Sequence, residues 1–269
     1  MIPLPGGREI GCVDQGPTDG PAVVLVHGMP GNVRDFKYLA PEMVGPLRTI
    51  CVDLPGFGTT PPNGLEVDDL ARALLRLVAA LELRRPILAG HSYGGIVATA
   101  AADLDAAAVG GVGLICSPGL RVHRGLRRIP RKLIGRALSS RWRQPASPWL
   151  VRAMHRSGFS RRLRDDEHIR CLEVIARYRP EVHRARLLRQ VHPTLQAWCD
   201  DDPFIEKELS EELDTLLRRR LKPSHHVAIA YPSGGHNPQK NHAAALGEAL
   251  TRFADAHAGR PPRSPNPDH

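Results

Sequence analysis

The chain has 269 residues, 42% of them hydrophobic, and a formal net charge of +9, which suits one large domain with a substantial core. The N-terminus lacks the long apolar core of a signal peptide, and no apolar run reaches the roughly 18 residues that a membrane span needs. The 5 cysteines are scattered without a C-x-x-C pair, which favours buried thiols in a reducing compartment. We therefore expect a cytoplasmic protein with no membrane span.

Short apolar runs alternate with glycine-rich turns and helical patterns along the chain. Residues 8–14 are typical of an edge strand, and residues 66–82 carry leucines and valines three and four residues apart, as in an amphipathic helix. Buried strands are expected at 23–26, 49–52, 86–89, 111–116, 195–198 and 227–230. Because strands that are apolar throughout are covered on both faces, the pattern predicts an α/β fold, a doubly wound and mostly parallel sheet flanked by helices.

The positive charge lies mainly in residues 119–190, which we call the arginine-rich segment. It holds 20 Lys and Arg against 5 Asp and Glu, whereas the rest of the chain holds 17 against 23. Its pattern is mostly helical, with breaks expected at Pro130, Pro145, Pro148 and Pro180. The charge can concentrate an anionic substrate, or hold the protein near nucleic acid or an anionic membrane. The alternative is that arginine is simply the solubilising residue that this chain prefers.

Residues 90–94, Gly-His-Ser-Tyr-Gly, are the most informative stretch of the sequence. They follow an apolar strand and precede a tightly packed helical pattern, which is the setting of a G-x-S-x-G nucleophile elbow. The turn is so sharp that side chains two residues before and after Ser92 would clash, so glycine is required there. The serine hydroxyl is then held clear of the sheet, at the positive end of a helix dipole.

The loops that follow the other strands complete a resemblance to the α/β-hydrolase fold family. His27-Gly28-Met29-Pro30, Asp53-Leu54-Pro55-Gly56-Phe57-Gly58, Trp198-Cys199-Asp200-Asp201-Asp202-Pro203 and Gly234-Gly235-His236 match loops of that family. The resemblance covers about residues 8–118 and 191–256 and includes the family's chain order of Ser, Asp and His. It implies a core formed by residues 1–118 and 191–257, with the arginine-rich segment (119–190) as a helical cap. The tail, 258–269, is Pro-rich and polar, and we expect it to be disordered.

A serine needs a general base, and the base needs an orienting acid. His236 is the expected base, because it follows the last strand at the carboxyl edge of the sheet. The resemblance assigns the acid to Asp202, the last of three neighbouring aspartates. Cys199 stands where the family usually has glycine, so Asp200 and Asp201 stay open as alternatives.

By the same resemblance, the backbone N–H groups of Met29 and Tyr93 form an oxyanion hole. His27, Gly28 and Phe57 belong to the adjoining loops and are candidates for the substrate pocket. The loop from Asp53 to Gly58 is otherwise interpreted as a structural turn. Aromatic and apolar residues of the arginine-rich segment are further pocket candidates: Trp142, Trp149, Met154, Phe159 and Tyr178.

These features predict a serine hydrolase that cleaves a carboxylic ester, thioester or lactone through an acyl-enzyme. Acyl transfer, or C–C or amide-bond hydrolysis, is the alternative on the same triad, and a non-catalytic anion-binding module is a more distant one. The expected partner is a small-molecule acyl substrate. An anionic substrate would suit the positive charge of the arginine-rich segment. No nucleic-acid partner is expected. No H-E-x-x-H motif or Cys/His cluster indicates a metal, and no G-x-G-x-x-G motif follows a strand, so no metal or cofactor is expected. The sequence leaves the oligomeric state open.

Overall fold

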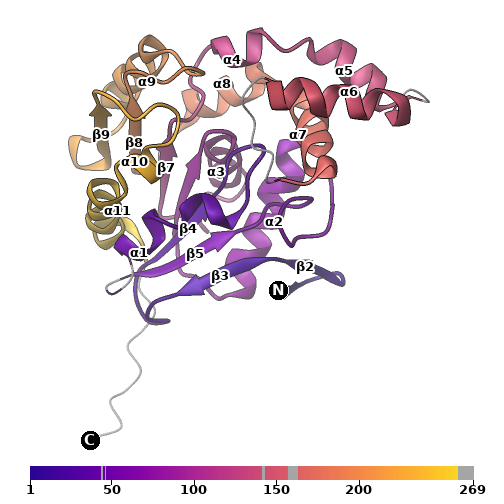
Figure 1. Ribbon diagram of the computed structural model, residues 1–269. Helices are drawn as coiled ribbons and strands as arrows, with labels where there is room; N and C mark the ends of the chain where they lie inside the picture. Colours follow the sequence, from indigo (N-terminus) through magenta and orange to yellow (C-terminus); the bar gives the residue numbers. More distant parts are fainter. Residues whose placement is uncertain (44, 46, 141–142, 157–162, 260–269) are drawn as a thin grey trace, which may run out of the picture.

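A computed structural model of the chain describes residues 1–43, 45, 47–140, 143–156 and 163–259 (Figure 1). Its centre is a seven-stranded sheet in which six strands run parallel and the first is antiparallel to its neighbour. From one edge to the other the order is β3 (Cys12–Gln15), β5 (Arg48–Val52), β4 (Ala22–Val26), β6 (Ile87–His91), β7 (Gly111–Ile115), β8 (Thr194–Cys199) and β9 (His226–Tyr231). The α/β fold with a mostly parallel sheet is thus confirmed.

The inner strands are buried on both faces because their side chains are apolar without alternation. Every residue of β4, β6 and β7 is buried, and the burial separates into two clusters, one on each side of the sheet. On one side pack α2 (Val67–Ala80), α3 (Tyr93–Leu104), α8 (Pro180–Arg189) and α9 (Lys207–Arg220). On the other side pack the 3₁₀ helix η1 (Val33–Phe36), α1 (Leu39–Met43) and α11 (Ala243–His257). Two short helices complete this part, η2 (Pro223–His225) and α10 (Pro238–Asn241).

The expected edge strand at residues 8–14 is in fact two strands. β2 (Arg8–Ile10) pairs with β1 (Ile2–Leu4) in a separate two-stranded sheet, whereas β3 joins the main sheet. The break is at Gly11, whose N–H donates to the Thr60 hydroxyl at 2.8 Å and whose carbonyl accepts from the N–H of Asp53 at 2.8 Å. These bonds to a loop replace the bonds that a continuous strand would make.

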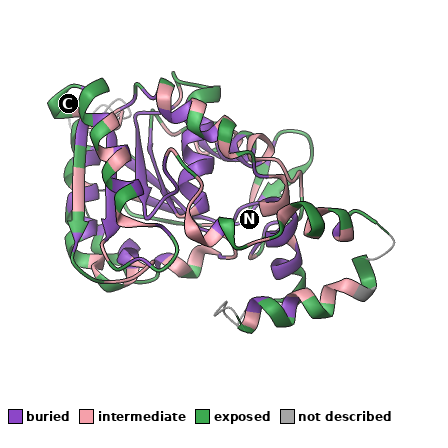
Figure 2. Ribbon diagram, turned by 90° about the horizontal axis from the view of Figure 1, so that it is seen from above, coloured by how far each residue is buried: buried purple, intermediate pink, exposed green. Residues whose placement is uncertain are grey.

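The arginine-rich segment contains α4 (Arg124–Arg127), α5 (Arg131–Leu138), α6 (Arg143–Arg156), α7 (Asp165–Arg177) and α8. α5 and α6 pack mainly on α7 and on each other, so they project beyond the sheet. Many of their residues are half-buried or exposed, drawn in pink and green in Figure 2. The breaks expected at Pro145 and Pro148 are wrong, because α6 runs through both positions. α8 packs on α3 and so lies beside the core.

All 5 cysteines are free thiols, and four of them are buried. None of the helices in the described part of the chain combines the length and the apolar composition that crossing a bilayer requires.

The elbow glycines give the first testable prediction. A Cβ on Gly94 would lie 2.1 Å from the Val26 carbonyl oxygen, at the end of a central strand that cannot move away. Gly94→Ala should therefore lower the free energy of unfolding by at least about 1–3 kcal/mol, as overpacking does, measured by urea denaturation. Gly135→Ala is the control, since its Cβ would meet only the Ala176 Cβ at 3.3 Å. Equal effects of the two substitutions would contradict the steric argument.

Candidate active site

The turn between β6 and α3 places Ser92 in a strained backbone conformation. Its φ of 51° and ψ of −120° lie in a region that side-chain-bearing residues rarely adopt. The N–H of Ser92 donates to the Ile115 carbonyl at 2.8 Å, and a Cβ on Gly90 would lie 2.1 Å from the Gly94 carbonyl carbon. The glycines on either side therefore allow the chain to reverse, and the serine stands at the N-terminus of α3.

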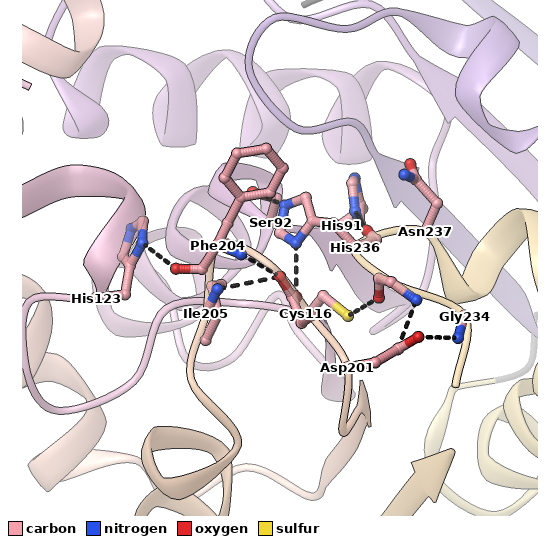
Figure 3. A network of polar contacts seen from close by, with 12 residues as sticks. His91, Ser92, Cys116, His123, Asp201, Phe204, Ile205, Gly234, His236 and Asn237 are labelled. Carbon is pink, nitrogen blue, oxygen red and sulfur yellow. Dashed lines mark hydrogen bonds and ion pairs between the residues drawn. The ribbon is translucent and has the colours of Figure 1, made fainter. Parts of the chain in front are cut away.

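Three side chains from distant parts of the chain meet at this turn, and Figure 3 labels two of them, Ser92 and His236. The Ser92 Oγ lies 2.9 Å from the His236 Nε2, and the His236 Nδ1 lies 2.7 Å from the Asp202 Oδ2. His236 comes from the loop after β9, and Asp202 from the loop after β8. The arrangement has the distances that a nucleophile, a base and an orienting acid require.

The carboxylate of Asp202 is held in its ionised form. Its second oxygen accepts the N–H groups of Phe204 at 2.8 Å and Ile205 at 3.0 Å. Burial alone would raise the pKa of Asp202, but the hydrogen bond and charge of His236 and the two N–H donors outweigh it, so the pKa lies below its ordinary value. The buried carboxylate can therefore stabilise a positive charge on the imidazole.

The two preceding aspartates have other partners. Asp200 accepts the Trp198 Nε1–H at 3.2 Å and pairs with Lys207 at 2.7 Å. Asp201 accepts the N–H groups of Gly234 and Gly235 at 3.2 and 2.8 Å, which secures the loop that carries His236. Of the three candidates, the structure brings Asp202 to the imidazole.

His91 supports the same loop, a role that the sequence analysis did not anticipate. Its Nε2–H donates to the His236 carbonyl at 2.7 Å, and the two rings have centroids 4.9 Å apart. Burial, and then the charge of His236, lower the pKa of His91 to about 3, so it is neutral at physiological pH. Its position next to Ser92 was a signal that it lies near the site, although its contact with His236 required the fold.

The loop after β4 brings Met29 to the pocket and keeps His27 out of it. The His27 Nδ1–H donates to the Gly28 carbonyl at 2.7 Å, and its Nε2 accepts the N–H of Leu54 at 2.9 Å. His27 thus ties together the loops that follow β4 and β5 from a fully buried position. Met29 and Tyr93, the two residues expected to supply oxyanion N–H groups, both line the pocket beside Ser92.

The pocket has a volume of about 440 Å³ and lies between the sheet edge and the arginine-rich segment. This size is in the range of small-molecule sites. Its lining combines core residues with residues of α4, α7 and their flanks: Met29, Ser92, Tyr93, Ile96, Pro118, His123, Gly125, Leu126, Arg128, Ile129, Ile175, Tyr178, Phe204 and His236.

Tyr178 is the one expected aromatic of the arginine-rich segment that the described residues bring to this lining. Trp149 is 70% exposed and has the Arg152 guanidinium over its ring, whereas Met154 is buried in the apolar cluster. Phe57 is buried against His27, and Gly28 lies behind Ser92, where a Cβ would approach the Ser92 Cβ to 3.0 Å. Trp142 and Phe159 lie outside the described residues.

Two groups of side chains have the donor types of a metal site. One is Cys116 with Asp202 and His236, and the other is His155 with Asp165 and His168 between α6 and α7. In the first, a hydrogen bond with Cys199 and then burial raise the pKa of the Cys116 thiol, which makes it a poor metal ligand. The second offers two imidazoles and a carboxylate, a donor set that zinc accepts.

The lowered pKa of Asp202 predicts a pH dependence of stability. Because the pKa is lower in the folded than in the unfolded state, the ionised carboxylate stabilises the fold above about pH 4. This contribution is lost as the pH falls through the lowered pKa. The difference in unfolding free energy between the native protein and Asp202→Asn should therefore shrink below about pH 4, measured by urea denaturation from pH 7 to pH 3. A difference that grows on acidification to pH 3 would contradict this.

Comparison with known proteins identifies the family of this chain. Residues 23–249 match the model of the alpha/beta hydrolase family. The chain is 34% identical over 117 residues to the dihydrolipoyllysine-residue acetyltransferase component of the acetoin cleaving system of Pseudomonas putida, covering 43% of this chain and 32% of that protein. It is 22% identical over 218 residues to the uncharacterized hydrolase YugF of Bacillus subtilis, covering 72% and 78%.

Among solved structures, an esterase from Exiguobacterium antarcticum superposes with a TM-score of 0.73 at 17% identity, covering 94% of this chain and 98% of that one. The chain spans only about a third of the length of the first curated relatives that it matches. The match to the family model, in contrast, extends over most of the chain. The chain belongs to the α/β hydrolase family.

Proposed function

We propose that the protein is a serine hydrolase that cleaves a carboxylic ester, thioester or lactone through an acyl-enzyme. The observation that carries the proposal is the pair of contacts at His236, 2.9 Å to the Ser92 hydroxyl and 2.7 Å to Asp202. A serine at the elbow, rather than an aspartate, makes the covalent intermediate an acyl-enzyme.

In the first step, the Ser92 Oγ attacks the acyl carbonyl while its proton moves to the His236 Nε2. Asp202 accepts the Nδ1–H, which sets the tautomer of the base and stabilises the imidazolium that forms. The imidazolium then gives the proton to the leaving oxygen or sulfur as the bond from the acyl carbon breaks. Water repeats the sequence on the acyl-enzyme and releases the acid and Ser92.

The tetrahedral oxyanion of each step would be bound by the backbone N–H groups of Met29 and Tyr93. Both residues line the pocket beside Ser92, and Tyr93 is the first residue of α3, where N–H groups have no partner within the helix. Two such donors and the helix dipole favour the charge that develops on the substrate oxygen. The arginine-rich segment would act as a cap, because its residues form the opposite wall of the pocket.

Acyl transfer on the same triad is the second candidate. A relative identified above is named as an acetyltransferase component, although the match covers only 32% of it. Hydrolysis and transfer share the acyl-enzyme and differ in whether water or another nucleophile reaches it. A cytoplasmic location and the absence of a nucleic-acid partner stay predictions.

Labelling by a fluorophosphonate tests the proposal. The probe phosphonylates a serine that a base activates, so the native protein should be labelled at Ser92, identified by peptide mass spectrometry. Ser92→Ala and His236→Ala should not be labelled. A native protein that is folded but unlabelled would overturn the proposal.

The three aspartates offer a matched series for the role of the acid. Asp202→Asn should lower kcat for an aryl ester by about 10⁴-fold, because the imidazole loses the partner that fixes its tautomer. Asp200→Asn changes a neighbouring carboxylate that contacts Trp198 and Lys207 instead, so its kcat should stay within a few-fold of the native value. A kcat of Asp202→Asn within a few-fold of the native value would exclude Asp202 as the acid.

A further inference from the structure

Among the residues that the structure describes, the lining of the pocket that holds Ser92 includes one guanidinium. Arg128 follows α4, and of the described residues that line the pocket it is the one with a permanent charge. No aspartate or glutamate belongs to that lining, and most of the remaining wall is apolar, including Met29, Leu126 and Ile175. The positive charge therefore has no compensating carboxylate within the pocket.

The neighbouring arginines differ from Arg128 because each has a partner. The guanidinium groups of Arg127 and Arg124 both pair with Glu206, that of Arg124 at 3.9 Å, and the Arg131 Nη1 donates to the Tyr178 carbonyl at 2.7 Å. Arg128 makes no side-chain hydrogen bond or ion pair with the residues that the structure describes. Arg128 is exposed to solvent and is one of the residues that line the pocket, so its guanidinium is available to a ligand.

His123 does not supply a second positive charge to the pocket lining. His123 also lines the pocket, and its Nδ1–H donates to the Phe204 carbonyl at 3.2 Å. Burial, together with the charge of His236, lowers the pKa of His123, so that its ring is neutral near pH 7. One fixed cation in a pocket of this size matches one monoanion, and the planar fork of a guanidinium fits a carboxylate with two hydrogen bonds.

We propose that Arg128 forms an anion subsite that binds a carboxylate carried by the substrate, at a distance from the bond that is cleaved. The preferred substrate is then the monoanion of an ester with a free carboxyl group, rather than a neutral lipid-like ester. This inference rests on the proposed function of Ser92, His236 and Asp202. It narrows the substrate class and gives one residue of the arginine-rich segment a specific role.

The experiment compares charged and neutral substrates of matched length in two series. In one, the carboxylate is on the acyl side: the mono-4-nitrophenyl ester of suberic acid is compared with its ω-methyl ester. In the other, it is on the leaving-group side: the butanoate ester of 4-hydroxybenzoate is compared with that of methyl 4-hydroxybenzoate. The native protein should prefer the anion in at least one series, with a kcat/KM ratio of about tenfold or more, as one charge-assisted hydrogen bond supplies.

Variants then locate the source of the preference. Arg128→Gln should bring the ratio of anionic to neutral kcat/KM close to one, and Arg128→Lys should keep only part of it, because an ammonium cannot bind both oxygens in plane. Arg136→Gln is the matched control: it removes the same charge from an exposed position on α5, outside the pocket lining. Its ratio should stay at the native value.

The inference fails if neither series shows a preference, or if Arg128→Gln keeps it. It also fails if Arg136→Gln lowers the ratio as much as Arg128→Gln, since the charge would then act at long range rather than at a subsite. Fluorophosphonate labelling of the same samples distinguishes failure of the proposed subsite from failure of the proposed hydrolase function. Labelled Ser92 without a charge preference overturns the subsite alone, whereas an unlabelled native protein overturns the hydrolase itself.

Discussion

The backbone at Ser92 is the constraint on which the rest of the site depends. A non-glycine residue with φ of 51° costs about 1–3 kcal/mol, and it persists because the surrounding main chain leaves no alternative. The Ser92 N–H is bound to the end of β7, and Gly94 lies against the carbonyl at the end of β4. The hydroxyl therefore has a fixed position above the sheet, and the loop that carries His236 must be brought to it. His91 and Asp201 hold that loop by its backbone.

Local patterns were sufficient to predict the sheet and the three residues that meet at its edge. Each of the three residues, Ser92, Asp202 and His236, follows an apolar run that predicts a strand. Because the carboxyl ends of parallel strands lie at one edge of the sheet, their positions in the sequence were enough to predict that they lie close together. Strand boundaries moved by one or two residues. The exception was Gly11, where hydrogen bonds to Asp53 and Thr60, 42 and 49 residues further along the chain, divide one expected strand into two. Such long-range hydrogen bonds cannot be predicted from the composition of the local sequence.

The pocket wall could not be predicted in the same way, because it depends on how helices are oriented. Met154 and Trp149 belong to one helix and were equally good candidates by composition, yet one is buried in the apolar cluster and the other faces solvent. His123 and Arg128 flank a helix of four residues, too short for its periodicity to show which side faces inward. Only the packing of this turn near Phe204 placed them in the lining of the pocket that also holds Ser92.

The charge around the pocket likewise depends on how distant segments of the chain pack together. A net excess of 15 positive charges in residues 119–190, from 20 basic and 5 acidic residues, describes the segment as a whole and no single point on its surface. Glu206, about 80 residues further along the chain, contacts two of these arginines, and Asp103 on α3 pairs with Arg186 and Arg189. These two acidic residues of the core thus pair with four arginines of the segment from outside it. What the substrate experiences is the remainder that faces the pocket, and among the described lining residues that remainder is Arg128. The side chain of Arg128 is exposed to solvent, so salt screens its charge as it screens the other surface arginines. What distinguishes Arg128 is its position in the lining of the pocket that holds Ser92, and the proposed specificity depends on that position rather than on the net charge of the protein.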